Sequence, residues 1–143
     1  MRAALIILSF AVALASCTAN EPVGHHPLAG TQWVLKAMAG WDSATAPQVP
    51  TIFFQSETSV GGRSGCNSWG GGYELKGTQI RFSRMRSTLM ACAYGMEFER
   101  LYVDMIEKTH TIRLNGDVLI LADESGTERA QFFRASTAVP PSR

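Results

Sequence analysis

The spacing of apolar residues changes once along this chain, and the change separates strands from a single helix. From residue 32 to 85, and again from 110 to 134, short apolar runs alternate with polar residues and are divided by turn-forming residues, as is typical of β-strands. Between Gly95 and Thr109 the apolar residues instead recur at helical spacing, on one face. That face comprises Phe98, Leu101, Tyr102, Met105 and Ile106. The solvent-facing side is expected to hold Glu97, Glu99, Arg100, Glu107 and Lys108.

The predicted strands and their order restrict the fold. They are Gln32–Met38, Thr51–Phe54, Ser59–Arg63, Tyr73–Lys76, Gln79–Met85, His110–Leu114, Val118–Leu121 and Gln131–Arg134. The glycines at 70–72 are expected to break the chain, whereas Asn115-Gly116 is typical of a two-residue hairpin turn. Parallel strands need crossover connections, which one helix cannot supply for so many strands. The sequence therefore predicts an α+β fold that is mainly antiparallel β, a curled sheet or cracked barrel packed with one α-helix.

The N-terminal residues have the pattern of an export signal. Arg2 supplies a positive charge, and Ala3–Ala15 is almost entirely apolar but too short to span a bilayer as a helix. The run ends in Leu14-Ala15-Ser16-Cys17, which resembles the bacterial lipobox and makes Cys17 the predicted lipidation site. The alternative is an ordinary signal peptide with an incidental cysteine. The predicted organisation is a lipoprotein signal peptide at 1–16, a lipidated tether at 17–27, one domain at 28–135 and a disordered tail at 136–143.

The residue after Cys17 and the net charge indicate where the protein is expected to lie and what it is expected to bind. Thr18, rather than an aspartate, follows Cys17, which by resemblance to lipoproteins of diderm bacteria favours the periplasmic face of the outer membrane. The chain has 13 Lys and Arg against 12 Asp and Glu, a formal net charge of +1. No basic stripe is visible that could neutralise nucleic-acid phosphates. We therefore expect a monomer that contacts the membrane through its lipid and does not bind nucleic acid.

Two cysteines remain in the domain once Cys17 is assigned to lipid. Cys66 and Cys92 form an even pair in an oxidising compartment, which favours a disulfide. In the chain-entropy treatment, a disulfide closing a loop of this length stabilises by about 3 kcal/mol. Alternatively, both cysteines are reduced and packed as small apolar residues. The adjacent His25 and His26 are expected to be solvated residues of the tether, and without further ligands at suitable spacing no metal or other cofactor is predicted.

No set of residues in the sequence predicts catalysis. His110 is the one histidine inside the expected domain, and no motif supplies a residue to orient it toward a cysteine nucleophile. The segment Gly62–Cys66 fails the G-x-S-x-G pattern of serine hydrolases at its last position. We therefore predict that the protein is not an enzyme.

Two groups of side chains could form binding surfaces. Trp69 and Tyr73 stand among glycines and are candidates for an exposed contact patch, although aromatic residues more often cover a core. The second group is a basic cluster, which could contact phosphate groups of lipopolysaccharide or lipids. It consists of Arg63, Arg81, Arg84 and Arg86. The alternative for the arginines is a solvated strand face.

The segments around Cys66 and Cys92 together resemble the two motifs of the META/HslJ family. Residues 65–73 (GCNSWGGGY) are similar to its GCN-aromatic-G-x-Y motif, and residues 87–92 (STLMAC) to its s-T-x-M-A-C motif. The matching positions are Gly65, Cys66, Asn67, Thr88, Met90 and Cys92. Glu97 follows where the family has an acidic residue, and the strands at 31–35 (TQWVL) and 116–121 (GDVLIL) also match.

The resemblance implies a small β-rich fold with one helix, similar to a cracked barrel, in an envelope lipoprotein or periplasmic protein. Some members are associated with heat shock, novobiocin tolerance or virulence, and the family has no established enzymatic activity. Our leading hypothesis is a non-catalytic, membrane-anchored envelope lipoprotein that binds a partner protein or supports tolerance of envelope stress. Two alternatives remain. One is an inhibitor of a lysozyme-like hydrolase, which should present an exposed loop, and the other carries a lipid or small apolar ligand inside the barrel.

Overall fold

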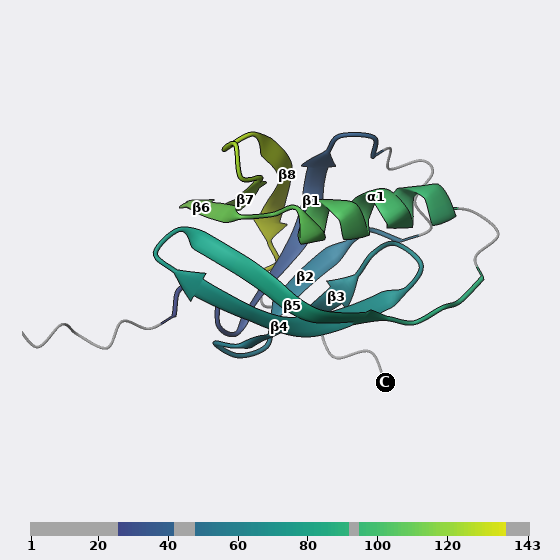
Figure 1. Cartoon of the computed structure of the whole chain (residues 1–143), viewed down its shortest axis with the longest axis horizontal. Coiled ribbons are helices and arrows are strands. Elements are labelled where there is room, and N and C mark those ends of the chain that lie inside the picture. Colours follow the sequence, from purple (N-terminus) through teal and green to yellow (C-terminus); the bar gives the residue numbers. More distant parts are fainter. Residues whose placement is uncertain (1–25, 42–47, 92–94, 137–143) are drawn as a thin grey trace, which may run out of the picture.

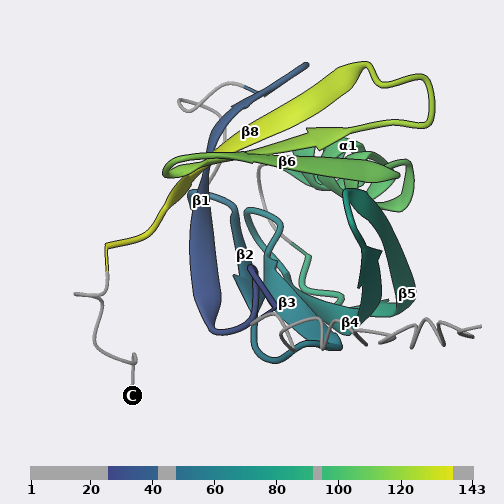
Figure 2. The same ribbon diagram turned by 90° about the vertical axis from the view of Figure 1, so that its left-hand side faces the viewer.

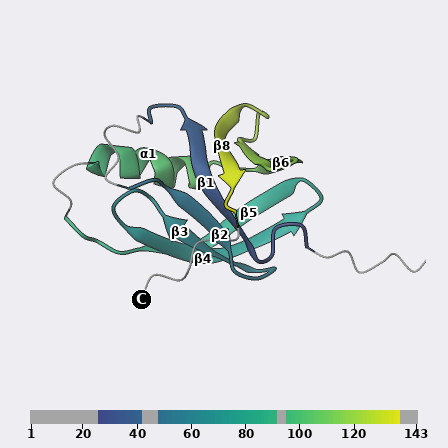
Figure 3. The same cartoon turned by 180° about the vertical axis from the view of Figure 1, so that it is seen from behind.

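A ring of antiparallel strands accompanied by one helix makes up residues 26–41, 48–91 and 95–136, which the computed structural model describes (Figure 1). Its elements are β1 (Thr31–Met38), β2 (Thr51–Phe54), β3 (Ser59–Arg63), β4 (Ser68–Lys76), β5 (Gln79–Ser87), α1 (Met96–Glu107), β6 (Thr111–Asn115), β7 (Val118–Ala122) and β8 (Glu128–Arg134). Each strand pairs with the next in sequence, and β8 returns to β1. Seen from behind, β1 therefore joins β8 on one side to β2 on the other (Figure 3). The predicted mainly antiparallel α+β fold is confirmed.

The ring is nearly open between β5 and β6. Within the described residues these strands share the single pair Gln79–Thr111, whereas β4 and β5 pair along most of their length. Helix α1 comes between β5 and β6 in the chain and lies beside the place where they diverge (Figure 2). Its residues Tyr102 and Ile106 are buried in the core of the ring. At this seam two backbone hydrogen bonds, from Ile80 N–H to the His110 carbonyl at 2.9 Å and from Ile112 N–H to the Thr78 carbonyl at 2.8 Å, close the ring, and helix packing covers the rest of the gap.

Large side chains fill the interior of the ring. Trp33, Phe54, Tyr102 and Phe132 are fully buried, and Tyr73 is 2% exposed. The Phe54 and Tyr73 rings meet edge to face with 5.0 Å between centroids, and those of Tyr102 and Phe132 with 6.5 Å. Burying one such side chain contributes roughly 1.5–3 kcal/mol, so the filled interior supplies a large share of the folding free energy.

The glycines at 70–72 lie inside β4, so the prediction that they break the chain is wrong. They face further glycines, since Gly61 of β3 pairs with Gly70. At Gly62 an added Cβ would lie 1.9 Å from the carbonyl oxygen of Thr51 in β2, too close for any side chain. Gly61, Gly62 and Gly71 therefore mark close backbone approaches within the sheet rather than turns.

Helix α1 has the predicted period, but two residues lie on unexpected faces. Phe98, Tyr102, Met105 and Ile106 are buried as predicted. Leu101, predicted for the apolar face, is 38% exposed, and Glu99, predicted for the polar face, is 8% exposed. The buried stripe is displaced toward Glu99 because the ring offers its carboxylate a hydrogen-bond donor. No helix in the described ranges, α1 included, has the length and apolar character needed to cross a membrane.

The strand limits differ from prediction where pairing continues past the apolar runs. Strand β4 begins at residue 68 instead of 73, β5 ends at 87 instead of 85, and β8 begins at 128 instead of 131. Polar residues extend these strands because ladder hydrogen bonds do not depend on the side chain.

His26 packs against the ring, so its placement in a solvated tether is wrong. Its ring contacts that of Tyr73 edge to face at 5.4 Å between centroids, and its Nδ1 lies 3.3 Å from the Tyr73 hydroxyl oxygen. The neighbouring Leu28 is fully buried. His25 lies outside the described residues.

Alanine at Gly62 should destabilise the protein strongly, whereas alanine at Gly70 in the adjacent strand should be tolerated. At Gly70 the nearest atom to an added Cβ is the Val60 carbonyl oxygen at 3.6 Å, an ordinary contact. We expect Gly62→Ala to lower the free energy of unfolding by about 3 kcal/mol, because β2 and β3 must separate. Gly70→Ala should change it by less than about 1 kcal/mol. Urea unfolding followed by circular dichroism measures both, and equal losses would contradict the close-approach argument.

Candidate functional site

The two sequence motifs meet at one buried amide, the side chain of Asn67. Its Oδ1 accepts hydrogen bonds from the Thr88 hydroxyl at 2.7 Å and from the Met90 backbone N–H at 2.8 Å. Its Nδ2 donates to Glu99 Oε2 at 2.8 Å. The Asn67 residue is 1% exposed, so these bonds form away from bulk water. We call Asn67, Thr88 and Glu99 the Asn67 hub.

The hub joins the loop before β4, the segment after β5, and helix α1. The Ser68 backbone N–H donates to the Thr88 hydroxyl at 3.1 Å, and the Thr88 N–H donates to the Ser68 carbonyl at 2.9 Å. Ser64 closes the loop, since its N–H and hydroxyl both donate to the Asn67 carbonyl oxygen, at 2.9 and 3.1 Å. Paired in this way, the buried amide acts as a cross-link between distant parts of the chain.

Glu99 is the member of the hub that sequence reasoning missed. The family resemblance indicated Glu97 as the acidic position, but Glu97 is exposed in the structure. Side chains two positions apart on a helix point in directions that differ by about 200°, so only one of Glu97 and Glu99 can face the ring. Glu99 directly follows Phe98 and precedes Tyr102 by three, which places it at the edge of the apolar stripe. Its position at the edge of this stripe is the feature of the sequence that could have predicted the burial of Glu99.

The remaining residues of the first motif have packing and covalent roles. Gly65 has a φ of 114°, and an added Cβ there would lie 3.3 Å from the Phe98 ring. Cys66 is 8% exposed and is disulfide-bonded. Its predicted partner Cys92 lies outside the described residues, as does Cys17. The pairing of Cys66 with Cys92 and the lipidation of Cys17 stay predictions.

Trp69 and Tyr73 belong to the core, so they do not form the exposed contact patch. They are 7% and 2% exposed, in line with the alternative that they cover the interior. The Tyr73 hydroxyl donates to the Ser56 carbonyl oxygen at 2.8 Å. Burial, with a smaller contribution from the Glu57 carboxylate, raises the pKa of Tyr73 to about 12. The phenol is therefore neutral at physiological pH and acts as a donor.

The predicted basic cluster is divided in the structure. Arg63 donates to a glutamine side chain that precedes β2, and Arg81 faces Glu74 across the β4–β5 pair. Arg84 and Arg86 instead line a surface concavity of about 460 Å³. Two of the four arginines thus line this hollow, whereas Arg81 lines a separate hollow of about 450 Å³ and Arg63 bonds to the glutamine.

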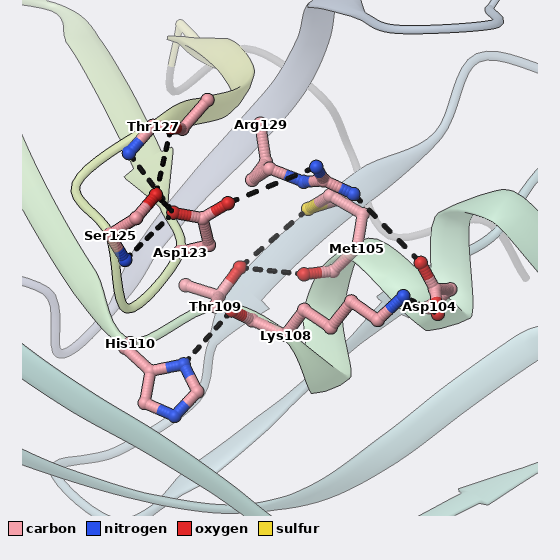
Figure 4. Close-up of polar contacts among 9 residues, drawn as sticks. All are labelled: Asp104, Met105, Lys108, Thr109, His110, Asp123, Ser125, Thr127 and Arg129. Carbon is pink, nitrogen blue, oxygen red and sulfur yellow. Dashed lines mark hydrogen bonds and ion pairs between the residues drawn. The ribbon is translucent and has the colours of Figure 1, made fainter.

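A second polar cluster ties the end of α1 to the turn between β7 and β8 (Figure 4). Asp123 accepts hydrogen bonds from the backbone N–H groups of Ser125 and Thr127, both at 3.0 Å. Arg129 lies 3.9 Å from Asp123 and 4.0 Å from Asp104 of α1. The hydrogen bond from the Ser125 hydroxyl lowers the pKa of Asp123, against a smaller opposing effect of burial and with further lowering by the two backbone N–H groups and Arg129. The hydrogen bonds to the ionised Asp123 carboxylate therefore stabilise the fold at neutral pH. This stabilisation is lost as the pH falls through the lowered pKa of Asp123.

Cys66 and His110, the candidates for catalysis considered in the sequence, both have structural contacts in the described residues. No three His, Cys, Asp or Glu side chains in that part of the chain come close enough to hold a metal ion. Cys66 cannot act as a thiolate nucleophile while it is disulfide-bonded. His110 Nδ1 lies 3.0 Å from the Lys108 carbonyl oxygen, a local backbone contact.

Apolar side chains face solvent on the segment that follows β5 and on helix α1. Leu89 is 96% exposed, Met90 54%, Met96 53% and Leu101 38%. These four, which we call the apolar end, are half of the eight large apolar side chains exposed in the described ranges. The backbone at Met90 is nevertheless held by Asn67. Exposed apolar side chains that gather into one patch mark interaction sites, which makes the apolar end the candidate surface among the described residues.

The fold and the hub define a class of protein: a small cracked barrel, closed by one helix and cross-linked by a buried amide. The META domain profile matches residues 26–137, which is most of the chain. The chain therefore belongs to the META domain family, and the resemblance drawn from its two motifs is confirmed.

Three solved structures share the fold. The NMR structure of a protein from Burkholderia xenovorans is 26% identical, with a TM-score of 0.61, and the match covers 76% of this chain and 84% of that one. A second NMR structure is 20% identical, with a TM-score of 0.60, covering 74% and 90%. The crystal structure of a DUF4847 family protein from Bacteroides vulgatus is 15% identical, with a TM-score of 0.53, covering 76% and 94%. No curated protein matches the sequence.

Removing the Glu99 carboxylate should destabilise the protein, whereas the same change at Glu97 should not. In Glu99→Ala the buried Asn67 amide loses its acceptor, which we expect to cost about 2 kcal/mol of unfolding free energy. Glu97→Ala, two residues away on the exposed side, should stay within about 0.5 kcal/mol of the native protein. Urea unfolding measures both. Hydrogen exchange at the Met90 amide should also accelerate in Glu99→Ala, and unchanged exchange would contradict a cross-linking role for the hub.

Proposed function

We propose that this META domain protein is a non-catalytic binding protein of the cell envelope, held at the membrane by a lipid on Cys17. In this proposal the apolar end docks into a partner protein, and tolerance of envelope stress is the cellular consequence of that binding. The observation that carries the proposal is Leu89, which is 96% exposed and directly precedes a residue whose backbone is bonded to Asn67.

The membrane anchor is supported by the sequence that precedes the ring. The apolar run at residues 3–15 leads into the lipobox-like Leu14–Cys17, and Thr18 favours the outer membrane. Lipid on the cysteine side chain and on the new amino terminus would provide the second chain that stable anchoring needs. His26 is nine positions after Cys17, so the ring would stand within about 30 Å of the membrane surface. The expected partner therefore also lies at the membrane.

The apolar end has the properties of a protein-docking surface. Transfer of an exposed leucine into an apolar pocket is favourable by about 1.5–3 kcal/mol. Met90 and Met96 have unbranched, polarisable side chains that adapt to the shape of a partner. Because the hub already holds the backbone at Met90, docking loses less conformational entropy than it would from a free loop. These properties fit an apolar pocket on a partner protein.

Inhibition of a lysozyme-like hydrolase is the second candidate, and the same segment favours it. Such an inhibitor needs a projecting loop on a rigid base, and residues 88–91 are exposed beside the hub. A carrier of lipid or small apolar ligand has less support, because side chains such as Trp33 and Phe132 fill the ring interior.

The anchor is tested by the mass and location of the protein in its own membrane. Protein extracted from membranes should begin at residue 17 with the added mass of its lipid. Cys17→Ser should move the protein out of the membrane fraction, because the thiol that carries the lipid is lost. Cys66→Ser is the matched control, and it should stay in the membrane with the same lipid mass. An unmodified start at Met1 in the extracted native protein would contradict the anchor.

The docking surface is tested by a photo-crosslinking residue in intact cells. At position 89 it should capture a specific membrane-associated protein, whereas at position 114, a leucine that is 38% exposed on β6, it should not. Leu89→Asp should reduce binding of the captured partner roughly tenfold or more, because docking would bury a charge. It should leave the melting temperature unchanged, since Leu89 is 96% exposed. Capture of a hydrolase would favour the second candidate, and equal capture at both positions would contradict the docking surface.

A further inference from the structure

The outer face of β3, β4 and β5 has a trough whose floor carries no side chains. Trp69 and Tyr73 of β4 are buried in the ring, so Gly70 and Gly72 between them face outward. Gly61 of β3 pairs with Gly70 and faces the same way. The lining residues are Thr58, Ser59, Gly70, Gly71, Gly72, Arg84 and Arg86, around a volume of about 460 Å³.

One wall of the trough is a β-bulge in β5. Between two regular pairs, Gly71 of β4 alone faces two residues of β5, Arg84 and Met85. Arg84 has a φ of 51°, and in the described ranges it is the one residue other than glycine with a positive φ. A bulge position with this conformation favours glycine, because other residues are strained there. An arginine held in a strained conformation beside a hollow indicates that its side chain has a use in that hollow.

The two arginines of the trough have no ionic partner in the described part of the chain. Neither guanidinium takes part in an ion pair or hydrogen bond there, whereas Arg113, Arg129 and Arg134 all pair with acids. Guanidinium groups bind phosphate through paired N–H donors, and this planar recognition is the reason arginine predominates at such sites. The glycine floor lets a ligand approach the backbone, and the exposed Thr58 hydroxyl adds a donor at the rim.

We propose that this trough binds the phosphate group of a small phosphate ester, with Arg84 and Arg86 as its ligands and Gly70 and Gly72 as its floor. The volume is within the usual range of ligand sites, about 300–1,000 Å³, so it admits the group that carries the phosphate as well. The same chemistry occurs in soluble sugar or glycerol phosphates and in the headgroup of an anionic phospholipid. The site does not depend on the proposed docking of the apolar end.

Three variants separate phosphate recognition from stability and from net charge. Arg84→Gly removes one guanidinium and relieves the positive φ, so its melting temperature should equal or exceed that of the native protein. Gly70→Val keeps both arginines but fills the floor, where the nearest atom to the new Cβ lies 3.6 Å away. Arg81→Ala is the matched control, since it removes the same charge from the same strand outside the trough.

The measurement is an NMR titration of the arginine Nε–Hε signals of the full-length protein in phosphatidylcholine nanodiscs. Glycerol 3-phosphate and inorganic phosphate are the soluble probes. We expect saturable shifts of the Arg84 and Arg86 signals. Arg84→Gly and Gly70→Val should each weaken binding roughly tenfold or more, while Arg81→Ala should change it less than about twofold.

Nanodiscs that also contain phosphatidylglycerol identify the source of the phosphate. Shifts of Arg84 and Arg86 on these discs without an added probe would assign the site to a lipid headgroup. Shifts that require glycerol 3-phosphate would assign it to a soluble ester. The proposal is overturned if neither probe nor the anionic discs shift these signals, or if Arg81→Ala weakens binding as much as Arg84→Gly does.

Discussion

The hydrogen bond between Asn67 and Glu99 fixes helix α1 against the ring of strands, which pairs least at the seam between β5 and β6. Strands β5 and β6 share one residue pair, so the interior depends on α1 for its cover at that seam. Apolar packing of Phe98, Tyr102 and Ile106 sets which face of the helix turns inward, but it is not directional and does not fix the helix to single atoms. The buried amide fixes one position of the helix, because any other would leave Asn67 without its acceptor.

The same hub connects the stability of the fold to its surface. Asn67 binds the backbone of Met90, and the neighbouring Leu89 therefore projects from a fixed position rather than from a free loop. Asn67 thus acts from inside the protein, whereas Met90, another motif residue, is 54% exposed. The hydrogen bonds of Asn67 hold the segment on which Leu89 and Met90 face solvent. Asn67 can therefore be distinctive in the sequence for the contacts that it makes within the fold.

Sequence reasoning succeeded where a prediction depended on neighbours along the chain. The limits of β2 and β3 were predicted correctly, since Pro50 precedes the first of these short apolar runs and polar residues separate the two. The hairpin at Asn115-Gly116 is present with Gly116 at a φ of 57°. The failures at Gly70, Leu101 and His26 share another cause. The environment of each of these residues is set by side chains and backbone from distant parts of the chain. The local sequence pattern carries no information about those distant neighbours.

The sequence by itself determined the number and type of the elements, their antiparallel arrangement and the family, because strand and helix periods and turn residues are local properties. Tertiary structure decided which residues are buried in packing and which line the surface. Gly62 must be glycine because of Thr51, Glu99 is buried because of Asn67, and Arg84 lines a trough because Gly71 forms a bulge with it. In each case the deciding atom comes from another element of the fold, and only folding brings the two together.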